Sequence, residues 1–571
     1  AWQERQALTA KQASVRNTLT QTFPKVQVVV DAPVQMEREL AQLRQAAGSV
    51  SVRNLEPLLA AAGAALPPGM SRYPGMLKAA AILAMLIQVL DMTIANVALP
   101  HMQAALGANQ DSISWVLTSY IVAAAIAIPA TGWLSDHLGR RKLYLISVGG
   151  FTLSSVLCGL ALNLETMVLF RILQGLFGAF LSPLGQTVML DNTAPEKRGQ
   201  AMAIFGMGVV TGPIIGPVVG GWLTENMDWR WVFFVNVPIG ALAFVGLLLF
   251  LPDLKRPSRS LDVLGFVLLA LGLASLQLML DRGQHEDWFN SLEIWLELGI
   301  SLSAFWMFAV HSKTSRNPLY PMTLLGNRNL MISAMLMGTV GIVMTAAMAL
   351  MPIMLQSLMN YPVLDAGMLL ATRGLGVMIM TGISGQVIHR VEPRLWMTVG
   401  LSMTAVSFWL MTRWNLDVGA TEMALNGVLQ GAGIGMLFVP ISLTAFATLP
   451  AEWRTDGSGI LNLTRSIGSS VGISLVIAFL ARSSAESHAN LVGHVTPYSL
   501  WVDPALFALP GDAVPTALAL LNAEVTRQAT MIAFLNDYYF MMFVSAAAIP
   551  LTLLLKKVRA SHQPQEALII E

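Results

Sequence analysis

The sequence predicts an all-α protein that crosses a membrane many times. Hydrophobic residues make up 55% of the 571 residues and charged residues only 12%, about half of the ~25% typical of a soluble protein. The mean hydropathy of +0.61 is too high for a chain with one or two anchors. Apolar stretches of about 17 to 25 residues, long enough to cross a bilayer as helices, recur along the chain. Barrel strands would instead alternate over about ten residues, which this sequence does not do.

These stretches give fourteen predicted membrane-spanning helices. Lys and Arg concentrate in the even-numbered loops between them, and cytoplasmic loops carry such an excess. Both ends of the fourteen-helix unit are therefore predicted to be cytoplasmic. The spans lie at approximately 79–100, 113–134, 142–162, 166–189, 200–224, 231–251, 262–280, 293–311, 329–353, 366–389, 396–412, 421–447, 458–481 and 536–556.

The segment 482–535 is the longest predicted loop and falls on the extracytoplasmic side. It contains amphipathic pieces such as 512–530. Two interpretations stay open: a solvated excursion, or a docking surface for a periplasmic partner.

The composition excludes several classes of protein. The chain has 34 Lys+Arg and 33 Asp+Glu, a net charge of +1, and so lacks the basic excess of a nucleic-acid-binding protein. The single cysteine, Cys158, excludes an internal disulfide framework and a Cys-rich metal site. The P-loop pattern and the motifs H-E-x-x-H and G-x-S-x-G are missing from the sequence. We therefore expect a secondary transporter that is not an enzyme, with no cofactor and no metal, driven by an ion gradient.

Residues 1–69 differ from the rest in their soluble composition. A strand-like run at Lys25–Val30 and a helix-like stretch at Val34–Ala47 predict a short α/β extension. The stretch TFPKVQVVVDAPVQMERELAQLRQAAG resembles the end region of the periplasmic, ferredoxin-like domain of the type II secretion protein L. Because a periplasmic location conflicts with the predicted cytoplasmic N-terminus, we expect a foreign or misjoined fragment here. Taken alone, this resemblance implies that the protein is a component of a secretion platform.

Corresponding segments recur at an offset of about 253 residues. Gly132 to Arg141 after the second span has the same Gly-to-Arg spacing as Gly385 to Arg394 after the tenth, and RILQG in span four matches GVLQG in span twelve. Transporters are commonly built from such repeats, with the substrate site between them. We predict a six-helix half at 70–260, two inserted helices at 261–312 and a second six-helix half at 313–571.

The loop after the second span, GWLSDHLGRRKL, is the most specific motif in the chain. Glycine permits close approach of helix ends, and an acid beside a basic cluster forms an ionic latch that breaks when two halves rock. Ordinary positive-inside charge would need neither the acid nor the glycines. The motif resembles the signature loop of the major facilitator superfamily, and it matches at Gly132, Asp136, Gly139, Arg140 and Arg141. In the second half His389 and Glu392 replace the acid and the glycine, which argues against a symmetric latch.

Asp91 lies inside the first predicted span, within LDMTIANVALP. An ionisable residue within a membrane is costly and by default has a function and a partner. Arg171 in span four falls at a similar depth and is the predicted partner. Protonation of Asp91 would release Arg171 and bias which face opens. A purely structural buried pair is the alternative.

Span five contains GVVTGPIIGPVVGG. Glycines four residues apart share one helix face and allow close helix contact, whereas alanine would serve for packing alone. The string resembles the antiporter motif of drug-exporting facilitators, a motif associated with exchange and with resistance to leak. Its matching residues are Gly208, Gly212, Pro213, Gly216, Pro217 and Gly220.

Polar residues elsewhere in the spans are secondary candidates. For the two arginines among them an interior function and snorkelling to an interface are equally open. These candidates are Asn96, Gln174, Gln356, Arg373 and Arg465.

The resemblance extends over residues 79–556. The segments LDMTIANVALP, DWRWVFFVNVPIG and LDRGQHEDW are similar to those of the fourteen-span drug/proton antiporter family of the EmrB/QacA type. This resemblance implies proton-coupled export of lipophilic or amphipathic drugs across the bacterial inner membrane, with Asp91 and Arg171 as the coupling pair. Gln356, Arg373 and the long loop favour the EmrB-like branch, whose members work with a periplasmic membrane fusion protein and an outer-membrane channel. A facilitator for one physiological metabolite is the alternative.

Overall fold

The computed structural model describes residues 71–253, 259–495 and 514–556. The chain divides into the units Ala1–Pro67 and Pro68–Glu571, and the predicted α/β extension at 1–69 lies outside the described residues. The described part of the second unit is helical and has no strand. Thirteen of its helices are long and apolar enough to cross a membrane, and α19 (Pro393–Met411) is helical at the remaining predicted span. The protein is therefore a multi-pass membrane protein, and the part of it that the structure describes is all-α.

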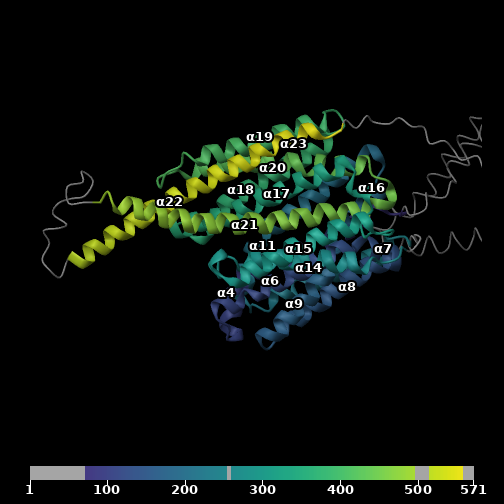
Figure 1. Ribbon diagram of the computed structural model, residues 1–571, viewed down its shortest axis with the longest axis horizontal. Coiled ribbons are helices and arrows are strands. Elements are labelled where there is room, and N and C mark those ends of the chain that lie inside the picture. The colour runs from purple at the N-terminus through teal and green to yellow at the C-terminus, as the bar shows by residue number, and fades with distance from the viewer. Residues whose placement is uncertain (1–70, 254–258, 496–513, 557–571) are drawn as a thin grey trace, which may run out of the picture. The chain divides into compact units, whose positions relative to one another are not determined.

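The helices fall into a first group, α4–α13, an inserted pair, and a second group, α17–α23 (Figure 1). The first group comprises α4 (Pro74–Leu106), α6 (Trp115–Ala127), α7 (Thr131–Leu138), α8 (Arg140–Gly159), α9 (Leu164–Gly178), α10 (Leu181–Asp191), α11 (Arg198–Asn226), α12 (Trp231–Phe234) and α13 (Asn236–Phe250), with the single turn α5 (Gln110–Ile113). The inserted pair is α14 (Val263–Arg282) and α15 (Leu292–Thr314). The second group comprises α17 (Arg328–Ile353), α18 (Val363–Val387), α19, α20 (Ala420–Ala447), α21 (Arg454–Val492), α22 (Val514–Ala547) and α23 (Ile549–Leu554), preceded by the short α16 (Met322–Leu325).

Local sequence signals set several helix ends. Pro74 begins α4, a position where proline is preorganised and its missing N–H is not needed. Gly107 ends the same helix with φ +63°, as a left-handed cap requires. Asn163 opens α9 with a capping box in which its side chain and that of Thr166 each accept a backbone N–H from the other residue.

The helix contacts in the two groups correspond. In the first group α4 packs against α11, α9 against α6 and α8, and α8 against α13. In the second group α17 packs against α21, α20 against α18 and α19, and α19 against α22. The groups meet chiefly where α11 contacts α18 and α20 and where α10 contacts α21. These contacts place α11, which carries the glycine-rich string, between its own group and the other.

The inserted pair is joined by a carboxylate at the start of α14. Asp262 accepts hydrogen bonds from the N–H groups of Gly265 at 2.9 Å and Leu319 at 3.0 Å. His311 Nε2 on α15 lies 2.8 Å from the same carboxylate. Partial burial raises the pKa of Asp262, but these hydrogen bonds outweigh it and the pKa lies below its usual value.

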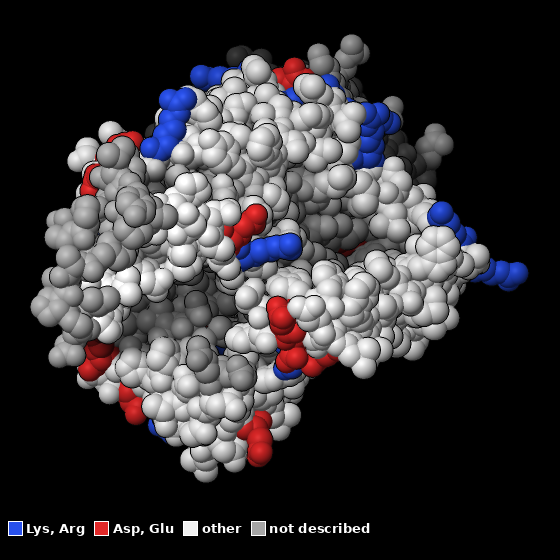
Figure 2. Space-filling view, turned by 60° about the vertical axis from the view of Figure 1, so that its left-hand side comes forward, with Lys and Arg blue, Asp and Glu red and all other residues white. Residues whose placement is uncertain are grey.

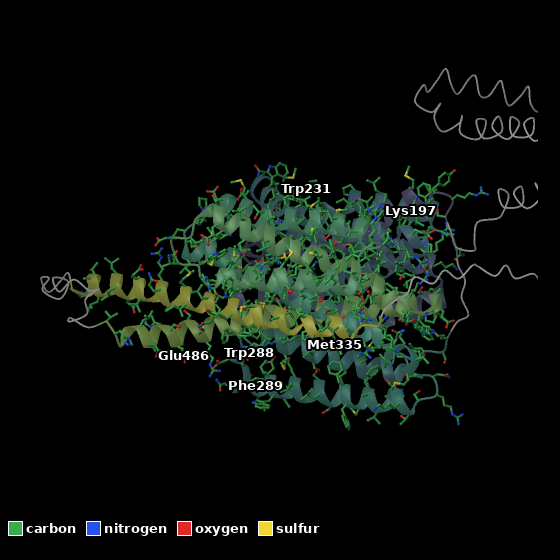
Figure 3. All side chains as sticks on the ribbon, turned by 90° about the horizontal axis from the view of Figure 1, so that it is seen from above. Lys197, Trp231, Trp288, Phe289, Met335 and Glu486 are labelled. Carbon is green, nitrogen blue, oxygen red and sulfur yellow. The ribbon has the colours of Figure 1, made fainter. Side chains whose placement is uncertain are left out.

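Within the described residues, the predicted loop 482–535 begins and ends in helices. α21 continues to Val492 and α22 already begins at Val514. Figure 1 shows both helices extending past the others at one end, and in Figure 3 Glu486 on this extension lies far from Lys197, which precedes α11 at the opposite end. The two helices pack together, and Asn536 donates to Ser483 Oγ at 2.8 Å. Pairing with each other explains how both continue beyond the bundle.

The outer surface is that of a protein in lipid. Large apolar side chains are exposed around the bundle, including Leu153, Trp222, Leu249 and Trp306. Figure 2 shows a mostly uncharged surface on which Lys, Arg, Asp and Glu are scattered. Such a surface would be an aggregation hazard in water.

Candidate functional site

The predicted pair of Asp91 and Arg171 forms a buried ion pair. Arg171 Nη1 on α9 donates to Asp91 Oδ2 on α4 at 2.6 Å, and both side chains have no solvent exposure. A buried charge pair is tolerable only when its remaining hydrogen-bonding groups are also satisfied. The surroundings of these two side chains therefore decide what the pair is able to do.

Two amides complete the hydrogen bonding of the carboxylate. Gln174 Nε2 on α9 and Asn236 Nδ2 on α13 each donate to Asp91 Oδ1 at 2.8 Å. Asn236 Nδ2 also donates to Ser155 Oγ on α8 at 3.0 Å, and that hydroxyl donates to the Phe233 carbonyl at 2.9 Å. Donors from α9 and α13 thus meet at the carboxylate of α4, and Ser155 of α8 contacts the amide of Asn236.

Arg171 is held on several sides. Its Nε donates to the Val116 carbonyl at 2.9 Å, its Nη1 also donates to Gln174 Oε1 at 2.8 Å, and its guanidinium lies 4.4 Å from the centre of the Tyr120 ring. Its Nη2 has no hydrogen-bond partner within the described residues. Protonation of Asp91 would leave this buried cation without a counter-charge, an unfavourable state that only a rearrangement relieves.

The glycine string on α11 packs against α4 on either side of Asp91. A Cβ on Gly212 would lie 2.5 Å from Val89 Cγ1, and one on Gly216 would collide with Thr93 Oγ1. Thr93 Oγ1 also lies within hydrogen-bond distance of the Gly212 carbonyl, at 3.3 Å. Gly208 meets Met85 and Gly220 meets Ile94 in the same way. The string therefore forms the contact face for the helix that carries the acid.

The opposite side of α11 touches the second group. Near its start a Cβ on Gly199 would lie 2.9 Å from the Gly385 carbonyl of α18, and one on Gly385 would lie 3.0 Å from the Gly199 carbonyl. Further along, Ile214 fills the space beside Gly374. Because α11 contacts both α4 and α18, a shift of α4 against α11 would be passed directly to the second group.

The signature-loop acid bridges the two groups. Asp136 Oδ2 at the end of α7 accepts from Arg259 Nε at 2.8 Å, and Arg259 Nη2 donates to Asp456 Oδ2 on α21 at 3.0 Å. A Cβ on Gly132 would collide with the Asp456 carboxylate, so this position needs glycine. Gly139 joins α7 to α8 with φ +86°, a backbone conformation that L side chains rarely adopt.

A second ionic bridge lies at the same end. Asp191, the last residue of α10, accepts from Arg140 Nη1 and from Arg454 Nη1 on α21, each at 2.7 Å. Arg141 instead donates to the Leu248 carbonyl at 2.6 Å. In the second group Glu392, just before α19, contacts Arg394 in the first turn of that helix at 3.7 Å. The ionic bridges between the groups therefore end on residues at the start of α21, Arg454 and Asp456, and the loop that precedes α19 takes no part in them.

Polar and apolar side chains of both groups meet in a closely packed region at the interface between the groups. Gln186 on α10 donates to Ser442 Oγ at 3.2 Å and accepts from Ser458 Oγ at 2.6 Å and from Asn462 Nδ2 at 3.2 Å. This region comprises Gln186, Phe205, Val209, Met337, Phe438, Leu461, Asn462 and Arg465.

The secondary candidates do not form one site. Gln174 belongs to the Asp91 cluster and Arg465 lies in the packed region between the groups. Asn96 on α4 and Gln356 in the π-helical turn η5 (Met354–Leu358) are exposed. Arg373 is buried on α18 and donates to the Met344 carbonyl at 2.8 Å, while its Nη1 has no partner within the described residues.

Several residues of these networks escape prediction from the sequence. Asn236 and Gln186 are polar residues in apolar spans, a signal that could have marked them. Arg259 looks like ordinary cytoplasmic charge, and Asp456 stands at the start of a predicted span. Arg259 and Asp456 join one ionic network only because α21 packs against α7 and α10.

Comparison with known proteins identifies the family of this fold. The family described as the Major Facilitator Superfamily matches residues 81–473. The multidrug export protein EmrB of Haemophilus influenzae is 34% identical over 427 residues, 74% of this chain and 84% of that protein. The probable multidrug resistance protein EmrY of Escherichia coli is 33% identical over 79% of this chain and 89% of that protein. Among solved structures, the proton:xylose symporter XylE shares the fold, with a TM-score of 0.55 at 14% identity over 84% of this chain and 95% of that chain.

Proposed function

Because this chain belongs to the major facilitator superfamily, we propose that it exports lipophilic or amphipathic drugs and other toxic compounds in exchange for protons. It is a transporter and not an enzyme. The names of its relatives EmrB and EmrY support drug export. A bacterial inner membrane, with both ends of the transporter in the cytoplasm, fits the distribution of Lys and Arg in its loops.

The observation that carries the proposal is the buried pair of Asp91 and Arg171. Asp91 is the proton carrier and the proton gradient supplies the energy. When the carboxylate is protonated, the uncompensated charge of Arg171 destabilises the present packing of α4, α9 and α13. Since α11 contacts both α4 and α18, the change reaches the second group and opens the other side.

The ionic bridges around Arg259 and Asp191 act as the cytoplasmic latch. They hold the groups together at the end where α7 lies in Figure 1. Exchange then requires the latch to break in each cycle, as expected for alternation between two packings.

The paired extensions of α21 and α22 (Figure 3) are the proposed contact region for a periplasmic membrane fusion protein, through which an outer-membrane channel is reached. This proposal concerns partners of the exporter and does not affect the coupling chemistry.

The test measures proton release from energised, inside-out vesicles that contain the full chain, with a pH-sensitive dye. Ethidium, benzalkonium and chloramphenicol are added in turn. We expect each to dissipate the gradient with the unaltered protein and none to do so with Asp91→Asn.

The matched control is Asp417→Asn, which removes an exposed acid between α19 and α20 and should leave the signal unchanged. Drug uptake that continues under a proton gradient with Asp91→Asn would refute the coupling role. A response to a single solute, with no competition from unrelated compounds, would instead favour a facilitator for one metabolite.

A further inference from the structure

Two buried polar atoms of the Asp91 cluster have no hydrogen-bond partner within the described residues. They are the Nη2 donor of Arg171 and the Oδ1 acceptor of Asn236. Both side chains are fully buried, and both are bound to Asp91, Arg171 at Oδ2 and Asn236 at Oδ1. A buried polar atom without a partner costs free energy and requires an explanation. Here the two atoms are a donor and an acceptor, so each is a suitable partner for the other.

The other amide of the cluster has both of its polar atoms in use. Gln174 Nε2 donates to Asp91 Oδ1 at 2.8 Å, and Gln174 Oε1 accepts from Arg171 Nη1 at 2.8 Å. The same Nη1 donates to Asp91 Oδ2 at 2.6 Å, so one guanidinium nitrogen lies between the amide oxygen and the carboxylate. A carboxyl and an amide that face each other form two hydrogen bonds once the carboxyl carries a proton.

Protonation of Asp91 therefore changes the partners of three groups. A proton on Oδ2 makes that oxygen a donor, and it takes the place of the guanidinium nitrogen opposite Gln174 Oε1. Arg171 then loses its counter-charge and two acceptors. Its Nε remains bound to the Val116 carbonyl at 2.9 Å, which limits how far the guanidinium moves. The buried cation consequently needs a new acceptor close by.

Asn236 offers such an acceptor in a fixed direction. Its Nδ2 donates to Asp91 Oδ1 at 2.8 Å and to Ser155 Oγ at 3.0 Å, and these two hydrogen bonds hold the plane of the amide. The Arg171 guanidinium already lies 5.8 Å from the centre of the Phe233 ring, on the short helix α12 that directly precedes Asn236. A small shift of the guanidinium towards α13 would bring it to the unpaired oxygen.

We propose that Asn236 is a positioning residue: when Asp91 is protonated, the guanidinium of Arg171 moves from that carboxyl to Asn236 Oδ1. Arg171 is on α9, Asp91 on α4 and Asn236 on α13, so the exchange releases α9 from α4 and binds it to α13. The neutral carboxyl stays bound to Gln174. The proposal rests on the export function given above, because it describes how the proton carrier of that exporter releases its partner.

The test moves the negative charge from the proton carrier to the proposed acceptor. Asp91→Asn stands in for protonated Asp91 and leaves Arg171 without a counter-charge, whereas Asp91→Asn/Asn236→Asp places a carboxylate where the guanidinium should arrive. The unfolding temperature of each purified full chain is measured. We expect Asp91→Asn to lower it and the double variant to recover most of the loss, because a close opposite charge stabilises a buried cation.

Gln88 on α4 provides the matched control. Its Oε1 is also buried without a partner within the described residues, but Gln88 takes part in none of the hydrogen bonds that Asp91 and Arg171 make there. Asp91→Asn/Gln88→Glu introduces the same charge and should not recover the unfolding temperature. Equal recovery in both double variants, or recovery in neither, would overturn the proposal.

An infrared measurement does not depend on the stability of a double variant that carries a new charge. Asparagine with an isotope label in its side-chain carbonyl is incorporated into the full chain, and subtraction of the spectrum with Asn236→Leu isolates the band of Asn236. A carbonyl that accepts a charge-assisted hydrogen bond absorbs at lower frequency. We expect the band to fall in frequency in Asp91→Leu, which removes the charge without adding an asparagine. An unchanged frequency would contradict the transfer of Arg171.

Both measurements use the purified chain without substrate or gradient, which separates this proposal from the export function. Recovery by Asn236→Asp in a chain that moves no compound across vesicles would leave the role of Asn236 standing and refute the exporter. Exchange of drug for protons by the unaltered chain, with neither recovery nor a band shift, would refute the role of Asn236 alone.

Discussion

Asp91 keeps a charge in a fully buried position because three side chains complete its surroundings. Arg171 neutralises it at 2.6 Å, and Gln174 and Asn236 each donate at 2.8 Å. A proton carrier and a structural pair differ in what happens when both charges are removed together.

Removing the two charges singly and jointly makes that distinction. Asp91→Asn or Arg171→Gln alone leaves one buried charge uncompensated, a cost of about 3 to 5 kcal/mol, and should lower the unfolding temperature of the purified protein. The double variant Asp91→Asn/Arg171→Gln leaves two neutral amides and should recover most of that loss.

Transport is the second measurement on the same variants. If the pair couples protons, the double variant stays stable but does not exchange drug for protons. A double variant that is both stable and active would show that the pair serves packing alone.

Individual residues differ in how far the sequence reveals them. Asp91 and Arg171 could be predicted as partners, because an acid and a base at one depth in apolar spans have few alternatives. Asn236 and Ser155 could not, since their roles depend on which face of α8 and α13 turns towards α4. Arg465 could be noted as intramembrane charge, but its position between the two helix groups required the structure.

At the scale of elements, α11 connects the acid-bearing helix with the opposite group. Its glycines let the α4 backbone come close, and its other side reaches α18 through Gly199 and Gly385. The glycine spacing could be predicted to form one contact face, whereas the identity of both neighbours required the structure.

The glycine face gives a prediction with a control on the same helix. Gly212→Ala places a Cβ 2.5 Å from Val89 Cγ1 and 3.2 Å from the Val89 carbonyl carbon, whereas a Cβ on Gly221 meets nothing within 4 Å. Overpacking of this kind costs about 1 to 3 kcal/mol. We expect Gly212→Ala to lower the unfolding temperature and the rate of proton-coupled uptake.

Gly221→Ala should match the unaltered protein in both measurements or be slightly more stable, because alanine favours the helix. The comparison cancels the difference in helix propensity between glycine and alanine. Equal behaviour of the two variants would mean that close contact between α11 and α4 is not needed for exchange.

Helix ends show where prediction from composition stops. The polarity of 482–535 predicts a loop, because apolar length was the criterion for a span. α21 and α22 instead remain helical beyond the apolar region by packing on each other. Hydropathy detects the apolar part of a helix. It does not detect where the same helix continues through polar residues.

At the scale of the whole transporter unit, the two groups are joined at one end by ionic bridges and in the middle by the hydrogen bonds of Gln186. If Asp91 carries one proton in each cycle, the charge moved in each cycle depends on the charge of the substrate.

This dependence gives a prediction about voltage. Export of an anion against import of a proton moves two charges in the favourable sense, a neutral compound moves one, and a monovalent cation moves none. Each charge gains about 2.3 kcal/mol from a potential of about 100 mV, so the anion gains twice that, which corresponds to more than about a thousandfold accumulation.

The measurement uses inside-out vesicles with a potassium diffusion potential, positive inside, and equal pH on both sides. Uptake of dodecanoate should respond most steeply, chloramphenicol should respond less, and dodecyltrimethylammonium should not respond. Vesicles with Asp91→Asn correct for passive entry. A cation that responds as steeply as the anion would exclude exchange with a single proton at Asp91, because only an exchange that moves net charge is sensitive to the potential.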